Sequence, residues 1–316
     1  MKFVIVSTKQ SGGGPIVLYR LAKTLEELGH DASIFNIGKV SDNRFKFILK
    51  QLNYWFNEWI RYSLIKLFPN STRAKRHYQG YVYFPVKGCK RKILPMVDDD
   101  TIVVYPEIVR GNPLHAKHVV RWLLYYNRFP GDTTWYSNTD LFVAYREQFN
   151  DLSLNPNGYL LKIYNFDKDL YKQTNYGERK GVCYFIRKGS NRSDLPRKFD
   201  GPILDNLSEP EKVRILNECE KCYLYDTQTF YESIAALCGC IPIVVPEIGK
   251  TKEDYVKKDD HLFGIAYSDT STEIEYAIQT REKVLLKINN IPSENIKNAE
   301  NFVHLCENYF GDELSS

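Results

Sequence analysis

Short runs of apolar residues alternate along the chain with longer segments in which apolar residues recur every three or four positions. The first run covers residues 2–7 and is followed by three glycines, by Pro15 and by a helical pattern that ends at Gly29. Similar runs predict strands at 31–36, 101–105, 134–136, 159–164, 181–186, 222–225 and 241–245, and helical spacing predicts helices at 113–125, 209–220, 230–237 and two more near the C-terminus. This alternation is typical of parallel sheets covered by helices, so the sequence predicts an α/β fold with doubly wound sheets.

The strand, loop and helix at the start of the chain have a counterpart that begins at Gly181. Between the two lies a polar stretch without a clear period, residues 165–180, which has the composition of a linker. We therefore predict two Rossmann-like domains that face a cleft, residues 1–165 and residues 166–291. The C-terminal helix, residues 292–316, is expected to pack back on the first domain.

The glycine-rich loop of the first domain does not match a dinucleotide-binding fingerprint. Val17 stands where the third glycine of that motif belongs, and no acidic residue lies near residue 34 after the second strand. Two interpretations stay open for Gly12, Gly13 and Gly14. They form a tight turn, or they form a loop at the cleft whose bare backbone lets a substrate approach the start of the helix.

The second domain carries a set of residues that predicts a site for an anionic ligand. Arg187 and Lys188 end its first strand, at the carboxyl edge where open α/β sheets bind ligands, and offer the charges that a diphosphate requires. After the next strand, backbone N–H groups at the start of a helix are further candidates for phosphate oxygens. Thr229 and Glu232 also have the spacing of a capping box, which is the alternative interpretation of that pair. The residues expected to bind the ligand are Arg187, Lys188, Ser190, Asp226, Thr227, Gln228, Thr229 and Glu232.

At this point the chain resembles a known family. The stretch from Ala235 to Pro246 is similar to the "EA-x-x-CG-x-P-V-V" segment of nucleotide-sugar glycosyltransferases of the GT-B fold. Further similarities follow in the family's order: residues 21–22 and 29–31 match its first helix and turn, 163–167 its "NGVD" hinge segment, 187–189 its Arg and Lys-Gly, and 208–216 the helix before its donor strand. Residues 105–122 resemble bacterial surface-polysaccharide transferases, which make lipopolysaccharide or capsule.

The resemblance implies the GT-B architecture, with the acceptor in the first domain and the sugar donor in the second. It implies a transferase that moves a sugar from a nucleotide diphosphate sugar, most simply a UDP-sugar, to a glycan or lipid-linked glycan in surface polysaccharide synthesis. Arg187, Lys188 and helix N–H groups would stabilise the leaving diphosphate, so neither a metal nor a cofactor is expected. Two alternatives stay open: a nucleotide-sugar epimerase of the same fold, and a non-catalytic, membrane-associated binding protein.

The chain departs from the family at one pair of acids. Retaining members often carry two glutamates separated by seven residues, but the corresponding positions here are Asp226 and Ile234, with Glu232 slightly displaced. The sequence therefore leaves open whether the configuration of the sugar is retained. If the configuration is inverted, the candidate general base for an acceptor hydroxyl is Glu107, which follows the strand at 101–105. The alternative interpretation is that Glu107 is an ordinary surface residue of a loop.

Two further groups of polar residues, a pair of histidines and a run of three aspartates, are interpreted as structural and not as metal-binding. His115 and His118 are expected to share a helix face with Trp122 and to serve packing, because no carboxylate or cysteine accompanies them as a metal ligand. Asp98, Asp99 and Asp100 precede a strand and are interpreted as a turn rather than a metal motif.

The charge of the chain is unevenly distributed. The chain has 43 Lys and Arg against 39 Asp and Glu, yet residues 44–92 contain twelve basic residues and a single acid, Glu58. In the same segment eight apolar residues recur at helical spacing: Phe45, Ile48, Leu49, Leu52, Trp55, Phe56, Trp59 and Ile60. An amphipathic, basic and aromatic helix is expected to bind an anionic membrane surface, the alternative being that the apolar stripe packs on the first sheet. Nucleic acid is not expected, because no binding motif accompanies the charge.

Cysteine usage and hydropathy bear on the location of the protein. The seven cysteines are an odd number without an export-signal pattern, which predicts reduced thiols in a cytoplasmic protein. If the basic segment binds lipid, the protein is expected at the inner face of the cell membrane.

Overall fold

The computed structural model describes residues 1–7, 13–38, 44–68, 86, 88–127, 131–132, 134–227, 229–255 and 263–314. The chain forms two compact units. The first unit comprises Met1–Asn165 and Pro292–Ser316, and the second comprises Phe166–Ile291.

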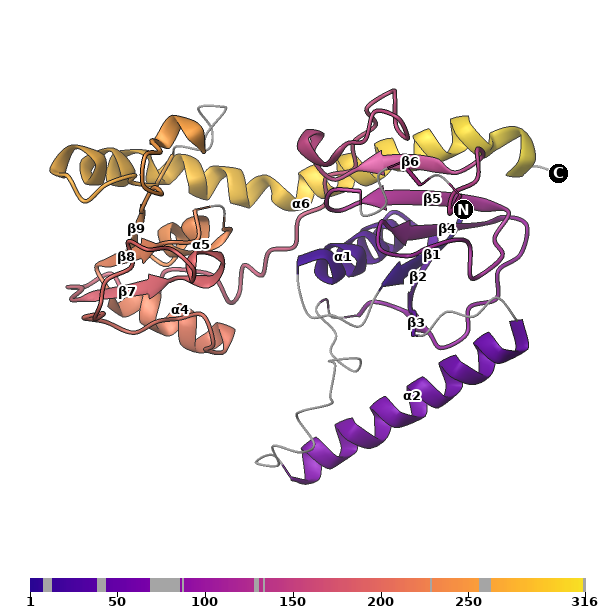
Figure 1. Ribbon diagram of the computed structural model, residues 1–316, viewed down its shortest axis with the longest axis horizontal. Coiled ribbons are helices and arrows are strands. Elements are labelled where there is room, and N and C mark those ends of the chain that lie inside the picture. Colours follow the sequence, from indigo (N-terminus) through magenta and orange to yellow (C-terminus); the bar gives the residue numbers. More distant parts are fainter. Residues whose placement is uncertain are drawn as a thin grey trace. The chain divides into compact units, whose positions relative to one another are not determined.

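The first unit is built on a sheet of six parallel strands in the order β3-β2-β1-β4-β5-β6 (Figure 1). The strands are β1 (Lys2–Ser7), β2 (Asp31–Asn36), β3 (Arg91–Lys92), β4 (Thr101–Pro106), β5 (His118–Leu123) and β6 (Leu141–Ala144). This is the strand order of a Rossmann fold, with the direction of strand addition reversing between β1 and β4. In such sheets ligands bind outside the carboxyl ends of the strands at the point of reversal.

Two helices cover one face of this sheet. Buried residues of α1 (Gly13–Glu27) and of the last part of α6 (Ser271–Leu314) form one core with the strands, to which α6 contributes Ala299, Phe302, Val303, Cys306 and Phe310. On the opposite face the core is closed by the loop after β4 and by Phe47 from α2 (Arg44–Leu67), whose ring lies 6.4 Å from that of Phe35. A short 3-10 helix, η1 (Glu147–Phe149), follows β6.

The second unit has a smaller parallel sheet in the order β7-β8-β9. The strands are β7 (Val182–Phe185), β8 (Lys221–Leu224) and β9 (Ile241–Val244). Helices α4 (Glu209–Glu218) and α5 (Tyr231–Leu237) pack on one face, and Ala277 from the first part of α6 packs on the other. Two short 3-10 helices, η2 (Arg187–Gly189) and η3 (Lys252–Asp254), follow β7 and β9. The predicted α/β class with parallel sheets is confirmed.

The helix predicted at residues 113–125 is wrong, because the structure has strand β5 there. His115 lies in a turn with a φ of 52°, whereas His118 and Trp122 are buried in the strand, so the three do not share a helix face. His118 does serve packing, since its ring lies 5.0 Å from that of Phe310. A strand that is buried on both faces has no polar alternation to distinguish it from a buried helix.

Other predicted boundaries also change. Residues 134–136 form a turn, the nearby strand being β6, and residues 159–164 contribute only an isolated bridge between Leu160 and Ala144. The two C-terminal helices are one, α6, which continues through Pro292. Helix α1 begins at Gly13, so Pro15 lies inside its first turn, where the backbone N–H that proline lacks needs no partner.

The stretch interpreted as a linker packs closely on the second unit. Arg179 donates hydrogen bonds to the carbonyl oxygens of Leu216 and Cys238, at the C-termini of α4 and α5, at 2.9 and 2.6 Å. Asn217 on α4 accepts the backbone N–H of Thr174 at 2.7 Å. Residues 166–180 therefore belong to the fold of the second unit rather than to a free connection.

Among the described residues no helix is long and apolar enough to cross a membrane.

Candidate functional site

The parallel register of the second sheet brings the residues that follow β7 and β8 to one edge. Phe185 pairs with Leu224, and Leu224 pairs with Val244, so the three strands end side by side. Arg187 and Asp226 each come two residues after the end of their strand. The candidate site lies at this carboxyl edge, where parallel sheets present side chains to ligands.

The backbone at Arg187 is strained and held in place. Its φ of 36° lies in the left-handed region, which costs a residue with a side chain about 1–3 kcal/mol. The backbone N–H groups of Ile186 and Arg187 donate to Asp205, at 3.2 Å to Oδ1 and 2.9 Å to Oδ2. A Cβ atom on Gly189 would collide with the backbone carbonyl of Tyr225, so the turn packs directly on the end of β8. The strain is thus compensated by contacts on both sides of the turn.

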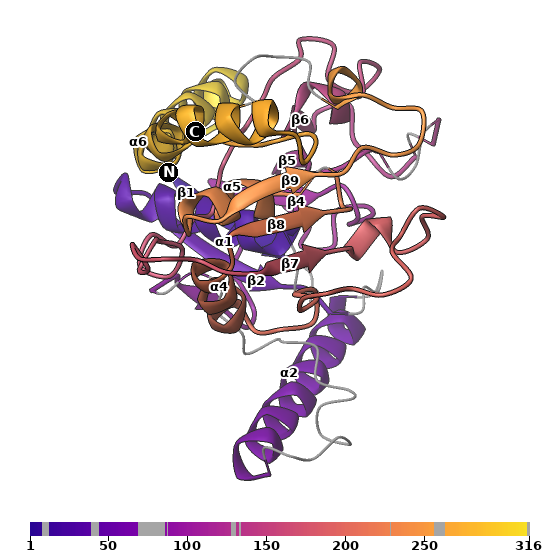
Figure 2. The same cartoon turned by 90° about the vertical axis from the view of Figure 1, so that its left-hand side faces the viewer.

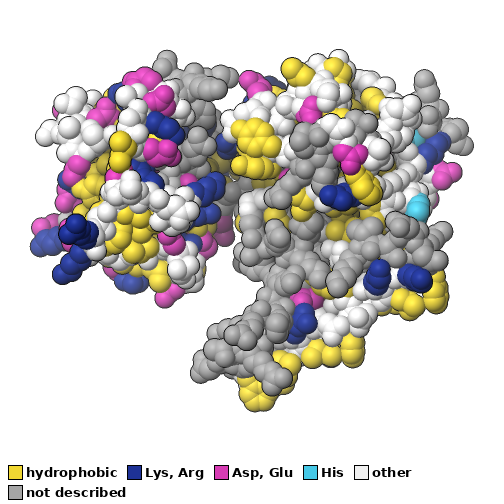
Figure 3. All heavy atoms as spheres, in the orientation of Figure 1, with side chains coloured by type: hydrophobic (Ala, Val, Ile, Leu, Met, Phe, Trp, Pro, Cys, Tyr) yellow, Lys and Arg dark blue, Asp and Glu magenta, His cyan; other side chains and the backbone are white. Residues whose placement is uncertain are grey.

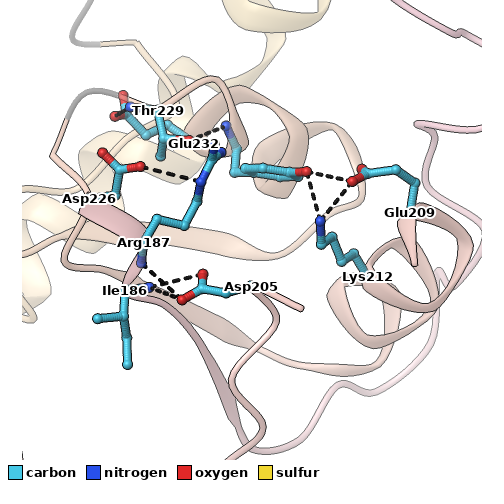
Figure 4. A network of polar contacts seen from close by, with 9 residues as sticks. Ile186, Arg187, Asp205, Glu209, Lys212, Asp226, Thr229 and Glu232 are labelled. Carbon is cyan, nitrogen blue, oxygen red and sulfur yellow. Dashed lines mark hydrogen bonds and ion pairs between the residues drawn. The ribbon is translucent and has the colours of Figure 1, made fainter. Parts of the chain in front are cut away.

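The side chain of Arg187 is anchored on one side and open on the other. Its Nε lies 3.7 Å from Oδ2 of Asp226, and its guanidinium carbon lies 5.4 Å from the centre of the Tyr231 ring (Figure 4). The Asp226 side chain is 3% exposed, whereas that of Arg187 is 44% exposed. A buried carboxylate therefore orients a guanidinium that faces solvent, and such a group can form two parallel hydrogen bonds to a phosphate.

Two backbone N–H groups at or just before the start of α5 donate to nearby side chains. The N–H of Thr229 donates to Oε1 of Glu232 at 3.2 Å, and the N–H of Tyr231 donates to Oγ1 of Thr229 at 3.3 Å. These contacts favour the capping interpretation of Thr229 and Glu232 over direct contact of the same N–H groups with phosphate. Burial, together with the negative charge of Asp226, raises the pKa of Glu232 to about 8, against the hydrogen bond from Thr229. Glu232 is therefore largely protonated at neutral pH and can donate a hydrogen bond.

A polar network of the buried Lys212 and the half-buried Glu209 holds Tyr231, whose ring lies against Arg187. The Tyr231 ring stacks on Phe185 with centroids 4.2 Å apart, and its hydroxyl donates to Oε1 of Glu209 at 2.6 Å. Lys212 donates to both partners, at 3.0 Å to Tyr231 and 2.7 Å to Glu209 (Figure 4). Burial alone would raise the pKa of Glu209, but the hydrogen bonds from Lys212 and Tyr231 outweigh it and lower that pKa below its usual value.

The other residues predicted to bind the ligand lie near this edge with fewer contacts. Lys188 and Ser190 are exposed at η2, and Thr227 is half-buried after Asp226. Gln228 lies outside the described residues. Lys188 thus adds a second solvent-facing positive charge next to Arg187.

In the first unit, Glu107 and Gly14 both adjoin Leu124, the residue that follows β5. Oε2 of Glu107 accepts the backbone N–H of Leu124 at 3.1 Å, and a Cβ on Gly14 would lie 3.6 Å from Cδ1 of the same leucine. Glu107 and Gly13, which begins α1, follow β4 and β1, the two strands between which the strand order reverses. Glu107 is buried, and its hydrogen bond to Leu124 gives it a structural role at the end of β5. A role of Glu107 as general base stays a prediction. Gly12 lies outside the described residues.

The remaining polar clusters have structural partners. Asp98 accepts hydrogen bonds from Lys2 at 2.6 Å and from Thr101, at the amino end of β4, which favours the turn interpretation of residues 98–100. All seven cysteines are buried and unpaired. Within the described part of the chain, no three His, Cys, Asp or Glu side chains are grouped so as to hold a metal ion.

Sequence reasoning missed three residues that build the site. Asp205 and Tyr231 orient Arg187, and Arg192 joins the strand ends by donating to the carbonyl oxygens of Val245 and Pro246, both at 2.7 Å. Asp205 lies 18 positions from its partner Arg187. The only signal of Tyr231 was its place beside Thr229 and Glu232.

No protein-family model matches the chain, and no curated protein matches it. Among solved structures it is similar to the glycosyltransferase SnogD from Streptomyces nogalater, with 13% identity, 97% of this chain and 99% of that chain covered, and a TM-score of 0.41. It is also similar to an alpha-glucosyltransferase in complex with UDP and a 13-mer DNA (11% identity, 100% of both chains, TM-score 0.42) and to MurG of Acinetobacter baumannii (10%, 95% and 100%, TM-score 0.30). At this level the likeness assigns neither substrate nor activity to this chain, whose α/β fold is established by its own strand order.

The pKa of Glu232 predicts how stability changes with pH. The folded state keeps the Glu232 proton up to about pH 8, whereas the unfolded chain releases it near the ordinary value of 4.5. Between these values the unfolded state binds fewer protons, so the free energy of unfolding falls as pH rises, by at most about 1.4 kcal/mol per pH unit.

Glu232→Gln should therefore show a weaker decline in stability than the wild type when urea denaturation is followed from about pH 5 to about pH 8. Glu282→Gln, which changes an exposed glutamate on α6, is the control and should follow the wild type. Parallel curves for the wild type and Glu232→Gln would show that Glu232 titrates like an exposed carboxyl.

Proposed function

We propose that the protein is a glycosyltransferase that uses a nucleotide diphosphate sugar as donor, with the diphosphate bound at the carboxyl edge of the second unit. The observation that carries this proposal is Arg187, whose guanidinium faces solvent at a strand end from a strained turn held by Asp205. Backbone strain persists where surrounding contacts compensate it, and it clusters at ligand-binding sites. The order of motifs that resembles GT-B glycosyltransferases supports the same assignment.

The proposed chemistry follows from the charges at this edge. When the bond between the anomeric carbon and the diphosphate oxygen breaks, negative charge develops on the leaving diphosphate. Arg187 and Lys188 stabilise that charge, and because Asp226 and Tyr231 hold the guanidinium before the ligand arrives, little side-chain freedom is lost on binding. Because Arg187 and Lys188 supply two positive charges at this edge, we propose that the reaction proceeds without a metal ion.

The finer parts of the proposal concern donor and acceptor. A UDP-sugar is the proposed donor, and a glycan or lipid-linked glycan of a bacterial surface polysaccharide is the proposed acceptor, bound by the first unit. If the enzyme inverts the sugar, Glu107 accepts the proton of the acceptor hydroxyl. Glu107 and Gly13 follow the strands at the reversal point of the first sheet, which is the expected ligand position in that unit.

Arg187→Ala and Lys188→Ala should each weaken UDP binding by about 1.5–3 kcal/mol, since each removes a charge-assisted hydrogen bond to phosphate. Isothermal titration calorimetry of the purified chain measures this loss directly. Arg214→Ala is the matched control, because Arg214 is an exposed arginine of the same unit whose partner is Glu218, on its own helix. Unchanged affinity in both site variants would remove the phosphate assignment.

The reaction itself is tested by incubating the protein with UDP-, GDP-, dTDP- and CMP-sugars and following the products by chromatography. A transferase should slowly release the nucleotide of its donor by transfer of the sugar to water: UDP, GDP or dTDP from the diphosphate sugars, and CMP from a CMP-sugar. EDTA should leave that rate unchanged. Conversion of the sugar without release would identify an epimerase. Absence of binding to every donor would favour a non-catalytic protein, and activity lost in EDTA and restored by Mn²⁺ would contradict the metal-free mechanism.

A further inference from the structure

Helix α2 buries its polar side and exposes its apolar side. The side facing the sheet of the first unit contains Gln51 and Glu58, both 0% exposed, together with Phe47. On the opposite side five large apolar side chains are each 44–70% exposed: Phe45, Leu49, Leu52, Phe56 and Trp59. This is the reverse of the usual surface helix, whose apolar stripe faces the core.

The five exposed side chains form one continuous stripe, which we call the α2 stripe. Their spacing of four, three, four and three residues places them within an arc of about 80° at 100° per residue. Figure 3 shows hydrophobic side chains along the outer edge of α2, and Figures 1 and 2 show the helix as one uninterrupted rod. From Phe45 to Trp59 the stripe extends over about 21 Å of the helix, at a rise of 1.5 Å per residue, so it is long enough to lie along a surface.

Specific contacts hold α2 in this rotation. Oε1 of Gln51 accepts the N–H of Gly38 at 2.8 Å, and the guanidinium of Arg91 lies 4.8 Å from the Trp55 ring on the flank of the helix. Arg61 donates to the buried carboxylate of Glu58 at 2.8 Å. Turning the stripe toward the sheet would break the first two contacts and expose Phe47. The outward position of the stripe is therefore part of the fold.

The charge beside the stripe is of one sign. Lys46 flanks it on one side and Lys66 on the other, Lys50 lies farther round the helix beyond Lys46, and all three are exposed. The single acid of α2, Glu58, is buried on the opposite side. Two copies of this helix packed stripe to stripe would bring lysines together without an exposed acid of α2 to pair with them, so a second copy of the chain is the poorer partner.

We propose that the α2 stripe docks on the surface of an anionic lipid bilayer, with Phe56 and Trp59 at the boundary of the acyl chains and the flanking lysines among the head groups. This inference goes beyond the proposed function and does not depend on it. It also moves the membrane contact to α2 within the segment 44–92. Lys90 and Lys92 lie 3.3 Å from Glu26 and 3.9 Å from Asp31, so their charges are partly compensated, and residues 73–76 lie outside the described residues.

Sedimentation of the full chain with large vesicles tests the proposal. The wild type should bind vesicles of equal parts phosphatidylglycerol and phosphatidylcholine at about 0.1 M salt, bind far less at about 1 M, and not bind phosphatidylcholine alone. The double variant Phe56→Ser, Trp59→Ser should lose at least about tenfold in affinity, because it removes the apolar contact. Leu152→Ser changes another exposed apolar residue of the first unit and should bind like the wild type.

A second pair of variants tests the charge. Lys46→Glu with Lys50→Glu should weaken binding to the anionic vesicles, whereas Lys287→Glu with Lys297→Glu, which makes the same change in net charge on α6, should not. Thermal unfolding monitored by circular dichroism should be the same for all variants, since every altered side chain is exposed.

Two results would overturn the proposal. One is a wild type that does not bind the anionic vesicles, or a stripe variant that binds them as well as the wild type does. The other is a lipid-free wild type that is dimeric by light scattering and becomes monomeric in Phe56→Ser, Trp59→Ser, while no vesicle binds. That second result would identify the stripe as an interface between two copies of the chain.

Discussion

The turn at the end of β7 is the constraint on which the candidate donor site depends. A strand that ends in an ordinary turn would leave Arg187 free to sample solvent. Here Asp205 accepts both backbone N–H groups of the turn, and Gly189 packs on the carbonyl of Tyr225, so the backbone is held at a positive φ. The main chain thus fixes the position from which the Arg187 side chain extends, and Asp226 and Tyr231 orient its guanidinium before any ligand is present, which lowers the entropy lost on binding.

A network of hydrogen-bonded polar groups in the second unit supports this edge. Tyr231 is clamped between Phe185 and the pair formed by Glu209 and Lys212, and it carries Arg187 on its ring. Because every one of these polar atoms has a partner, the network adds rigidity at little cost in desolvation. Removing Glu209 would leave the buried ammonium group of Lys212 without its carboxylate partner, so this substitution should affect the fold and the site together.

The sequence predicted an element accurately where turn-forming or charged residues mark the ends of that element. The strands at 2–7 and 31–36 are confirmed at both ends, because glycines and charged residues bound them. The sequence predicted a helix in place of strand β5, because both faces of the strand are buried and its residues do not alternate between apolar and polar. The strand can bury even the charged Arg121, because this residue pairs with Asp140 at 2.8 Å. The apolar stripe of α2 was predictable, but its outward direction was not. That direction depends on Gly38 and Arg91, which are remote in sequence from the side chains they contact.

Within the site, sequence position identified the charges but not what holds them. Arg187 and Asp226 follow predicted strands, and parallel pairing brings them to the same edge. Asp205 has no motif around it, and its function as an acceptor for the turn follows only from the folded backbone. The sequence also offered the N–H groups at the start of α5, but those of Thr229 and Tyr231 donate to Glu232 and Thr229, which leaves Arg187 and Lys188 as the main candidates for phosphate contact.

A crystal structure of the protein soaked with UDP would show whether Arg187 binds the diphosphate of the donor. The β-phosphate should lie at the carboxyl edge of β7, with oxygens about 3 Å from the guanidinium nitrogens of Arg187. The turn at Arg187 should keep its positive φ in the complex. UDP bound with its phosphates elsewhere, for example beside Gly13 and Glu107 in the first unit, would contradict this role of Arg187.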